Sequence, residues 1–175
     1  MNNMDKRNLH SKKTIKEALI LLSAKREFID ISVQDLCKEA GISRSTFYNN
    51  YHSLGDVVAE ISAEYMEKIR GKHLNREFFN SLTEDGNELK LLVETGVFGR
   101  EFSFYLKDLM AGELSGTKKG TRDDILLNIK ALYHAFGVFG VLQNLSKMYG
   151  SDYYDTFRSE AIDTLMELSG RLSEE

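Results

Sequence analysis

The residues best suited to binding chemistry lie in one short polar run, residues 43–50. The run reads SRSTFYNN and holds three aliphatic hydroxyl groups, one guanidinium, one phenol and two amides. Hydroxyl and amide groups bind phosphate oxygens, and arginine and asparagine form paired hydrogen bonds with base edges in the major groove of DNA. The chemistry that this run predicts is therefore recognition of a nucleic acid.

Two short helical patterns, separated by a glycine, must position this run. Apolar residues at helical spacing predict a helix over residues 33–40, which ends where Gly41 lets the chain turn sharply. Ser43 is a preferred N-cap residue for a second helix, in which Phe47 and Tyr51 are spaced to face inward. This arrangement is typical of a helix-turn-helix, although an ordinary helical hairpin with a polar surface has the same pattern.

The rest of the chain is predicted to be helical as well, so the fold class is all-α. The 175 residues include no proline and 13 glycines, and no regular strand alternation occurs. Capping-box patterns at Thr14 with Glu17 and at Ser53 with Asp56 predict two further helix starts. Helices are expected at about residues 12–26, 33–40, 43–51, 55–70, 122–149 and 152–172, with three more within 77–110 that are broken near Gly86 and Gly96, and a loop at 115–121.

Charge divides unevenly along the chain. The whole sequence has a formal net charge of −4, but residues 1–58 hold nine Lys or Arg against seven Asp or Glu, and residues 59–175 hold fourteen against twenty. The N-terminal third is therefore the part that a polyanion would prefer. A cluster of basic residues before the first apolar helix is expected to lie on phosphates as an arm, and it consists of Lys6, Arg7, His10, Lys12, Lys13 and Lys16.

Several other classes of function lack their residues in this sequence. The four histidines have no second histidine or cysteine at metal-ligand spacing, and Cys37, the only cysteine, is expected as a buried thiol. No glycine-rich phosphate loop or nucleophile elbow occurs, so we expect no enzyme activity, no metal and no cofactor. No signal peptide or uncharged apolar stretch of about 18 residues is apparent, which predicts a cytoplasmic protein without a membrane span.

The run SVQDLCKEAGISRSTFYNNYHSLGDVV, residues 32–58, resembles the DNA-binding signature of TetR/AcrR-type transcriptional regulators. It looks most like the branch whose recognition helix begins Arg-Ser-Thr-Phe-Tyr, here residues 44–48, and the resemblance covers about residues 12–58. It implies a three-helix helix-turn-helix head, residues 1–54, and a helical C-terminal dimerisation and effector domain, residues 55–175. It also implies a homodimer that binds double-stranded DNA at a pseudo-palindromic operator, as a repressor that a small-molecule effector releases.

The resemblance also implies roles for single residues. Thr46 and Tyr48 match residues that meet the phosphate backbone, and Asn49 and Asn50 match positions on or beside the base-reading face. Leu54 stands where the family usually has a phosphate-binding lysine, so that contact is missing, and His52 is only a weak substitute. The full set expected to contact DNA is Ser43, Arg44, Ser45, Thr46, Tyr48, Asn49, Asn50 and His52.

Two sets of residues in the C-terminal half are candidates for further contacts. The last two predicted helices are apolar on more than one face, which predicts that the same pair of a second subunit covers one face. Gly137 and Gly140 either allow close backbone approach there or merely soften the helix. The expected dimer residues are Phe139, Leu142, Leu145, Phe157, Ala161, Leu165 and Leu168. The residues that either line an effector cavity or form ordinary core are Phe98, Phe102, Tyr105, Tyr133, His134 and Phe136.

A second function stays open on the sequence alone. Leucine in place of lysine at position 54 also fits a helical protein-interaction or small-molecule-binding module that has lost DNA binding. Binding to a palindromic site that weakens steeply as salt rises would favour the regulator, and no binding to any DNA at low salt would favour the module.

Overall fold

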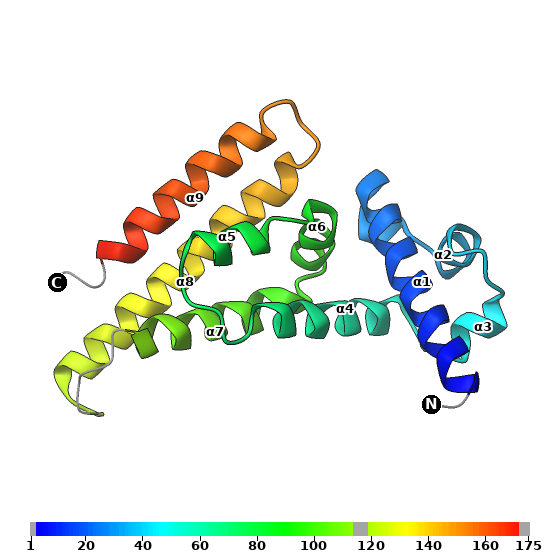
Figure 1. The fold of residues 1–175 in the computed structure, drawn as a ribbon, viewed down its shortest axis with the longest axis horizontal. Helices are drawn as coiled ribbons and strands as arrows, with labels where there is room; N and C mark the ends of the chain where they lie inside the picture. The colour runs from blue at the N-terminus through cyan, green and yellow to red at the C-terminus, as the bar shows by residue number, and fades with distance from the viewer. Residues whose placement is uncertain (1–2, 114–118, 172–175) are drawn as a thin grey trace.

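The chain is helical wherever the structure describes a regular element (Figure 1). The structure is a computed structural model that describes residues 3–113 and 119–171. The all-α class is confirmed for these residues. The elements are α1 Asn3–Lys25, the 3₁₀ helix η1 Phe28–Asp30, α2 Val33–Glu39, α3 Arg44–Tyr48, α4 Leu54–Ile69, α5 Arg76–Leu82, α6 Gly86–Thr95, α7 Val97–Glu113, α8 Arg122–Met148 and α9 Tyr154–Arg171.

The N-terminal helices α1, α2 and α3 lie together at one end of the molecule, and α4 leads away from them (Figure 1). Their apolar side chains meet in the interior, where Ile15, Leu36 and Phe47 are each 0% exposed. Burying an apolar side chain of this size stabilises the fold by about 1.5–3 kcal/mol. Packing of this kind holds the short helix α3 in a fixed orientation on its neighbours.

The C-terminal helices form the larger part of the molecule. α7 and α8 pack along one another, α9 returns beside α8, and α6 contacts α1, α4, α7 and α8 (Figure 1). Phe98 and Phe102 stack with ring centroids 4.6 Å apart, and both lie near the Phe139 ring of α8. A Cβ atom at Gly99 would overlap the Phe139 ring, so this glycine allows α7 and α8 to approach closely.

The helix α6 touches both α1 and the connection between α8 and α9. Its first residue, Gly86, is buried against Tyr149, whose ring occupies the space that a Cβ atom at position 86 would need. One turn later, Lys90 Nζ donates to the Ser23 carbonyl oxygen in the last turn of α1, at 3.0 Å. Because Tyr149 directly follows α8, α6 contacts both the α8–α9 connection and α1.

The first helix begins earlier than predicted. α1 extends from Asn3 rather than from residue 12, because neither proline nor glycine interrupts residues 3–13. Thr14 is therefore not an N-cap residue, and its Oγ1 donates to the His10 carbonyl oxygen at 3.0 Å inside the helix. The basic cluster expected as an arm is thus the N-terminal part of α1.

The other helix boundaries agree with the sequence to within a few residues, with one exception. Ser53 and Asp56 form the predicted capping box at the start of α4, and Gly96 ends α6 with a φ of 69°. The exception is α3, which ends at Tyr48, because residues 49 and 50 form a turn. The loop predicted at 115–121 lies mostly outside the described residues.

One helix is long and apolar enough to cross a membrane, by length and composition alone. Within the described residues only α8 meets this condition, with a mean hydropathy of 1.6 over an 18-residue stretch of which 22% is buried. The sequence alone did not indicate this helix as a membrane span, because Lys130 interrupts the uncharged run. A single helix of this kind is weak evidence for a membrane span, because apolar helices of soluble proteins have the same composition.

Candidate nucleic-acid interface

A tight turn at Gly41 brings α3 across the end of α2. Gly41 has a φ of 64°, a conformation that glycine adopts without the cost that a Cβ atom imposes. The Ile42 amide donates to the Cys37 carbonyl oxygen at 3.0 Å, which closes the turn onto the last part of α2. Cys37 is the buried thiol expected from the sequence, and burial raises its pKa.

Side-chain hydrogen bonds hold the first turn of α3. Ser43 Oγ accepts from the Thr46 amide at 3.0 Å, and the hydroxyl groups of the two residues lie 2.9 Å apart. Asn50 Nδ2 donates to the Thr46 carbonyl oxygen at 2.7 Å. Three of the eight residues predicted to contact DNA therefore use polar groups to shape α3.

The two faces of α3 differ as the sequence predicts. Phe47 is 0% exposed and Tyr51 is 5% exposed, whereas Tyr48 is 52% exposed. The side chains of Arg44, Ser45, Asn49 and His52 are exposed as well. The outer face of α3 thus offers a guanidinium, a hydroxyl, a phenol and an amide over little more than one helical turn.

The start of α4 lies beside this face and carries a negative charge. The Asp56 carboxylate accepts from the amides of His52, at 2.8 Å, and Ser53, at 2.9 Å. These backbone bonds hold the pKa of Asp56 below its ordinary value. Leu54, the first residue of α4, is partly buried against the core and lines a cleft between η1, α6 and α8. An apolar residue here therefore has a packing partner, and the position offers no positive charge to a phosphate.

Two members of the basic cluster form ion pairs with α4. Lys12 Nζ lies 2.7 Å from Glu60 Oε2, and Lys16 Nζ lies 3.2 Å from Glu60 Oε1 and also contacts Glu64. Burial lowers the pKa of Lys16, but its bonds to Glu64 and Glu60 raise it above the ordinary value overall. Burial raises the pKa of Glu60, but the two lysines lower it by more than burial raises it. The pKa of Glu60 therefore lies below its ordinary value. Lys16 and Glu60 therefore both stay charged, and the carboxylates of α4 already balance the positive charges of Lys12 and Lys16.

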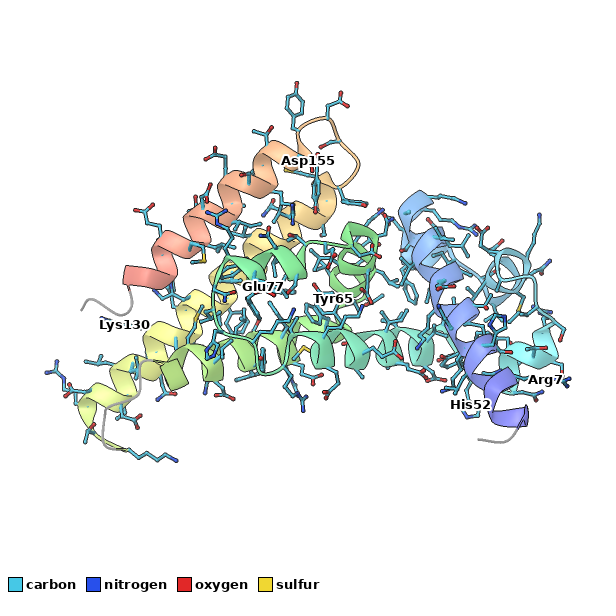
Figure 2. The ribbon with its side chains drawn as sticks, in the orientation of Figure 1. Arg7, His52, Tyr65, Glu77, Lys130 and Asp155 are labelled. Atoms are coloured by element: carbon cyan, nitrogen blue, oxygen red, sulfur yellow. The ribbon has the colours of Figure 1, made fainter. Side chains whose placement is uncertain are left out.

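The remaining members of the basic cluster are accessible. Arg7, His10 and Lys13 are exposed along α1, while the Lys6 side chain lies outside what the structure describes. Arg7 and His52 lie at the same end of the molecule (Figure 2). The exposed positive charge of this end thus comes from the beginning of α1, from Lys38 on α2 and from Arg44 on α3.

The six aromatic residues proposed as an effector cavity do not come together. Phe98 and Phe102 are each 0% exposed and stack inside the core, and the Tyr105 hydroxyl donates to the Ile69 carbonyl oxygen at 2.9 Å. The other three, Tyr133, His134 and Phe136, line an apolar groove of about 710 Å³ on α8 and α9. The first group is therefore core, and the second belongs to an outer surface.

The predicted dimer residues are also divided by the structure. Leu142, Leu145 and Leu165 are buried within the subunit, and Phe139 is partly buried and packs on α7, so little of these four side chains is available to an outer contact surface. Ala161 is partly buried, and Phe157 and Leu168 are exposed. The sequence showed that α8 is apolar on two faces, but not which face the subunit itself covers. The exposed apolar residues of α8 are Ile125, Leu126, Ile129, Leu132, Tyr133 and Phe136.

A polar cleft between α4, α6 and the α8–α9 connection was not predicted. It has a volume of about 810 Å³ and contains the ion pair between Lys68 Nζ and Glu88 Oε2, 3.0 Å apart. Tyr65 lines the same cleft, and its buried hydroxyl donates to the Leu82 carbonyl oxygen; burial raises the pKa of this phenol. Lys68 and Glu88 lie on different helices, so no local sequence pattern indicates their contact.

Neither a metal-binding group among the described residues nor a similar known protein points to a function for this site. No group of three or more His, Cys, Asp or Glu side chains within residues 3–113 and 119–171 is placed to hold a metal ion. The outer face of α3 can form hydrogen bonds and attract anions. No protein-family model matches this chain, and no curated protein matches it at significant similarity.

Proposed function

We propose that the protein is a dimeric, sequence-specific DNA-binding regulator of transcription, a repressor of the TetR/AcrR type. In this proposal residues 1–54 form the DNA-binding head, and residues 55–175 form the dimerisation and effector domain. The observation that carries it is the two-sided character of α3, whose aromatic residues are buried while its outer face presents hydrogen-bonding groups. Such a face has no packing role, but it suits the edge of a DNA groove.

The contacts divide between reading bases and positioning α3. Arg44 and Asn49 are exposed and suit guanine and adenine edges respectively, while Ser45 and Tyr48 suit phosphate oxygens. Ser43, Thr46 and Asn50 are bonded to one another and to the backbone of α3, so their role in the proposal is to hold the helix in shape. The exposed residues of the basic cluster on α1 add phosphate contacts.

The second subunit would cover the exposed apolar face of α8 together with Phe157 and Leu168 of α9. A two-fold pair of this kind forms a four-helix bundle. It would place two copies of α3 on successive major grooves, about 34–36 Å apart, which requires a pseudo-palindromic operator. A Cβ atom added at Gly137 or Gly140 would meet no neighbouring atom within 4 Å in the described subunit, so the choice between close approach and softening of α8 depends on that partner.

An effector would act through α4, which connects the head to the remaining helices. The polar cleft beside α4 suits a small polar molecule because it contains both Lys68 and the buried carboxylate of Glu88. A molecule bound there would favour one orientation of α4 and so change the spacing of the two heads.

The test uses the full-length protein and fragments selected from the source genome by their binding to it. Fluorescence anisotropy on a selected fragment should give a dissociation constant that rises steeply with salt. Tyr48→Ala should cost about 1–3 kcal/mol of binding free energy. Tyr153→Ala is a matched control, because Tyr153 is also exposed, at 74%, but lies in the α8–α9 connection. Equal losses for both variants, or no binding of any fragment at low salt, would refute the proposal.

The apolar groove on α8 and α9 favours a second candidate function, a helical module that binds another protein or a small apolar molecule. This candidate predicts a protein that binds no DNA at any salt concentration. It also predicts that changes on the outer face of α3 have no effect on activity in the cell. The selection of genomic fragments therefore separates the two functions directly.

A further inference from the structure

Two carboxylates of α4 hold two lysines that would otherwise be available to an anion. Glu60 lies 2.7 Å from Lys12 and 3.2 Å from Lys16, and Glu64 contacts Lys16 as well. Lys13, between them in sequence, pairs only weakly with Glu17 of the same helix, at 3.7 Å. The acidic residues of α4 thus neutralise one side of α1 and leave its other side charged.

The two lysines differ in how firmly they are held. The Lys16 side chain is 14% exposed and lies between two carboxylates. The Lys12 side chain is 32% exposed and has one carboxylate, that of Glu60. Lys16 is therefore a structural tie between α1 and α4, whereas Lys12 could exchange its partner without leaving the surface.

Lys12 also lies next to the element proposed to enter the DNA groove. Its Nζ atom is 5.1 Å from the centroid of the Tyr51 ring, and Tyr51 follows α3 by three residues. Arg7, one and a half turns before Lys12 on α1, lies at the same end of the molecule as His52 (Figure 2). Tyr51 itself faces inward, so in the proposal Lys12, whose side chain is 32% exposed, would be reached by a phosphate that lies along the exposed beginning of α1.

We infer that Glu60 competes with DNA phosphate for Lys12, and that this contact keeps the protein in a state of reduced DNA affinity. The inference rests on the proposed function and names one means of its regulation. Any movement of α4 that separates Glu60 from α1 would release Lys12 for a phosphate. The number of phosphates that the protein neutralises would then depend on the position of α4.

The salt dependence of binding counts the phosphate contacts directly. Each contact adds about 0.9 to the slope of log affinity against log salt, which is about 3.5-fold in affinity between 200 and 50 mM salt. Glu60→Gln should therefore steepen the slope by about this amount. Glu39→Gln is a matched control, because the Glu39 side chain is 32% exposed against 29% for Glu60, and it pairs with Lys25 at the far end of α1.

Replacing the lysine provides the second arm of the experiment. Lys12→Met in the otherwise unchanged protein should leave the salt slope as it is, because Glu60 already holds that lysine. Combined with Glu60→Gln, the same change should cancel the steeper slope. Circular dichroism of every variant tests whether it is folded. If Glu60→Gln is not folded, Lys12→Met can still overturn the inference, because a slope reduced by about 0.9 would mean that Lys12 already contacts phosphate.

Three results would overturn the inference. They are equal slopes for Glu60→Gln and Glu39→Gln, a slope reduced by about 0.9 in Lys12→Met alone, and a steeper slope that persists in the double variant. In each of these cases the unchanged protein still binds DNA, and the proposed function stands. Absence of DNA binding by the unchanged protein would overturn both.

Discussion

Replacing Ser43 by alanine tests whether this hydroxyl group shapes α3 rather than contacting DNA. Its Oγ accepts the Thr46 amide at 3.0 Å and lies 2.9 Å from the Thr46 hydroxyl. Loss of an N-cap of this kind costs about 1 kcal/mol. α3 has only five residues and holds Phe47, which is 0% exposed, so fraying of its first turn would disturb a core side chain. We expect the free energy of unfolding to fall by about 1 kcal/mol.

The neighbouring serine is the control. Ser45 is exposed, and its hydroxyl makes no hydrogen bond within the described residues. Ser45→Ala should therefore leave the free energy of unfolding within about 0.5 kcal/mol of the unchanged protein, while it weakens DNA binding by about 1.5 kcal/mol through loss of a bond to phosphate. Urea unfolding followed by circular dichroism measures the first quantity, and fluorescence anisotropy measures the second. If the two variants lose the same stability, our assignment of the two serines is wrong.

Three further changes probe other parts of the molecule. Leu54→Lys should tighten binding to every DNA sequence about equally and leave site preference unchanged, since phosphate contacts carry no sequence information; unchanged affinity in a filter-binding assay would contradict this. If the proposed dimer forms through α8, Ile129→Glu should convert it to a monomer in sedimentation velocity, because Ile129 is 59% exposed on α8, whereas Ile29→Glu, at an 85% exposed position on η1, should not. The pKa of Glu60 lies below the ordinary 4.5, so its ion pairs stabilise the fold above pH 4.5. This stabilisation is lost as the pH falls through the lower pKa of the folded state. Glu60→Gln should therefore flatten the acid part of the curve of unfolding free energy against pH.

The sequence predicts the parts of this structure that depend on local chemistry. Ser53 with Asp56, the turn at Gly41 and the inward pair Phe47 and Tyr51 lie within a few residues of one another, and backbone geometry alone relates them. The same local rule failed at Thr14. Its capping-box pattern predicted the start of a helix, but α1 already runs through this position because nothing interrupts it.

The remaining features depend on contacts between distant residues. Lys12 and Glu60 are 48 positions apart, and no periodicity reveals that α4 neutralises part of the basic cluster. The two apolar faces of α8 have similar compositions, and only the packing of α6, α7 and α9 on α8 decides that Leu142 is inside and Phe136 outside. The sequence therefore predicted which residues of α3 form the candidate site. It did not predict which basic residues are already paired with carboxylates, or which face of α8 is open to a second subunit.

The contact between Gly86 and Tyr149 limits which sequences can adopt this fold. The tyrosine ring takes the place of a side chain at the start of α6, so any larger residue there would push the α8–α9 connection outward. The same helix bonds α1 through Lys90, and a displaced α6 would strain that bond as well. A library of random codons at position 86, screened for folded protein, should consequently return glycine alone.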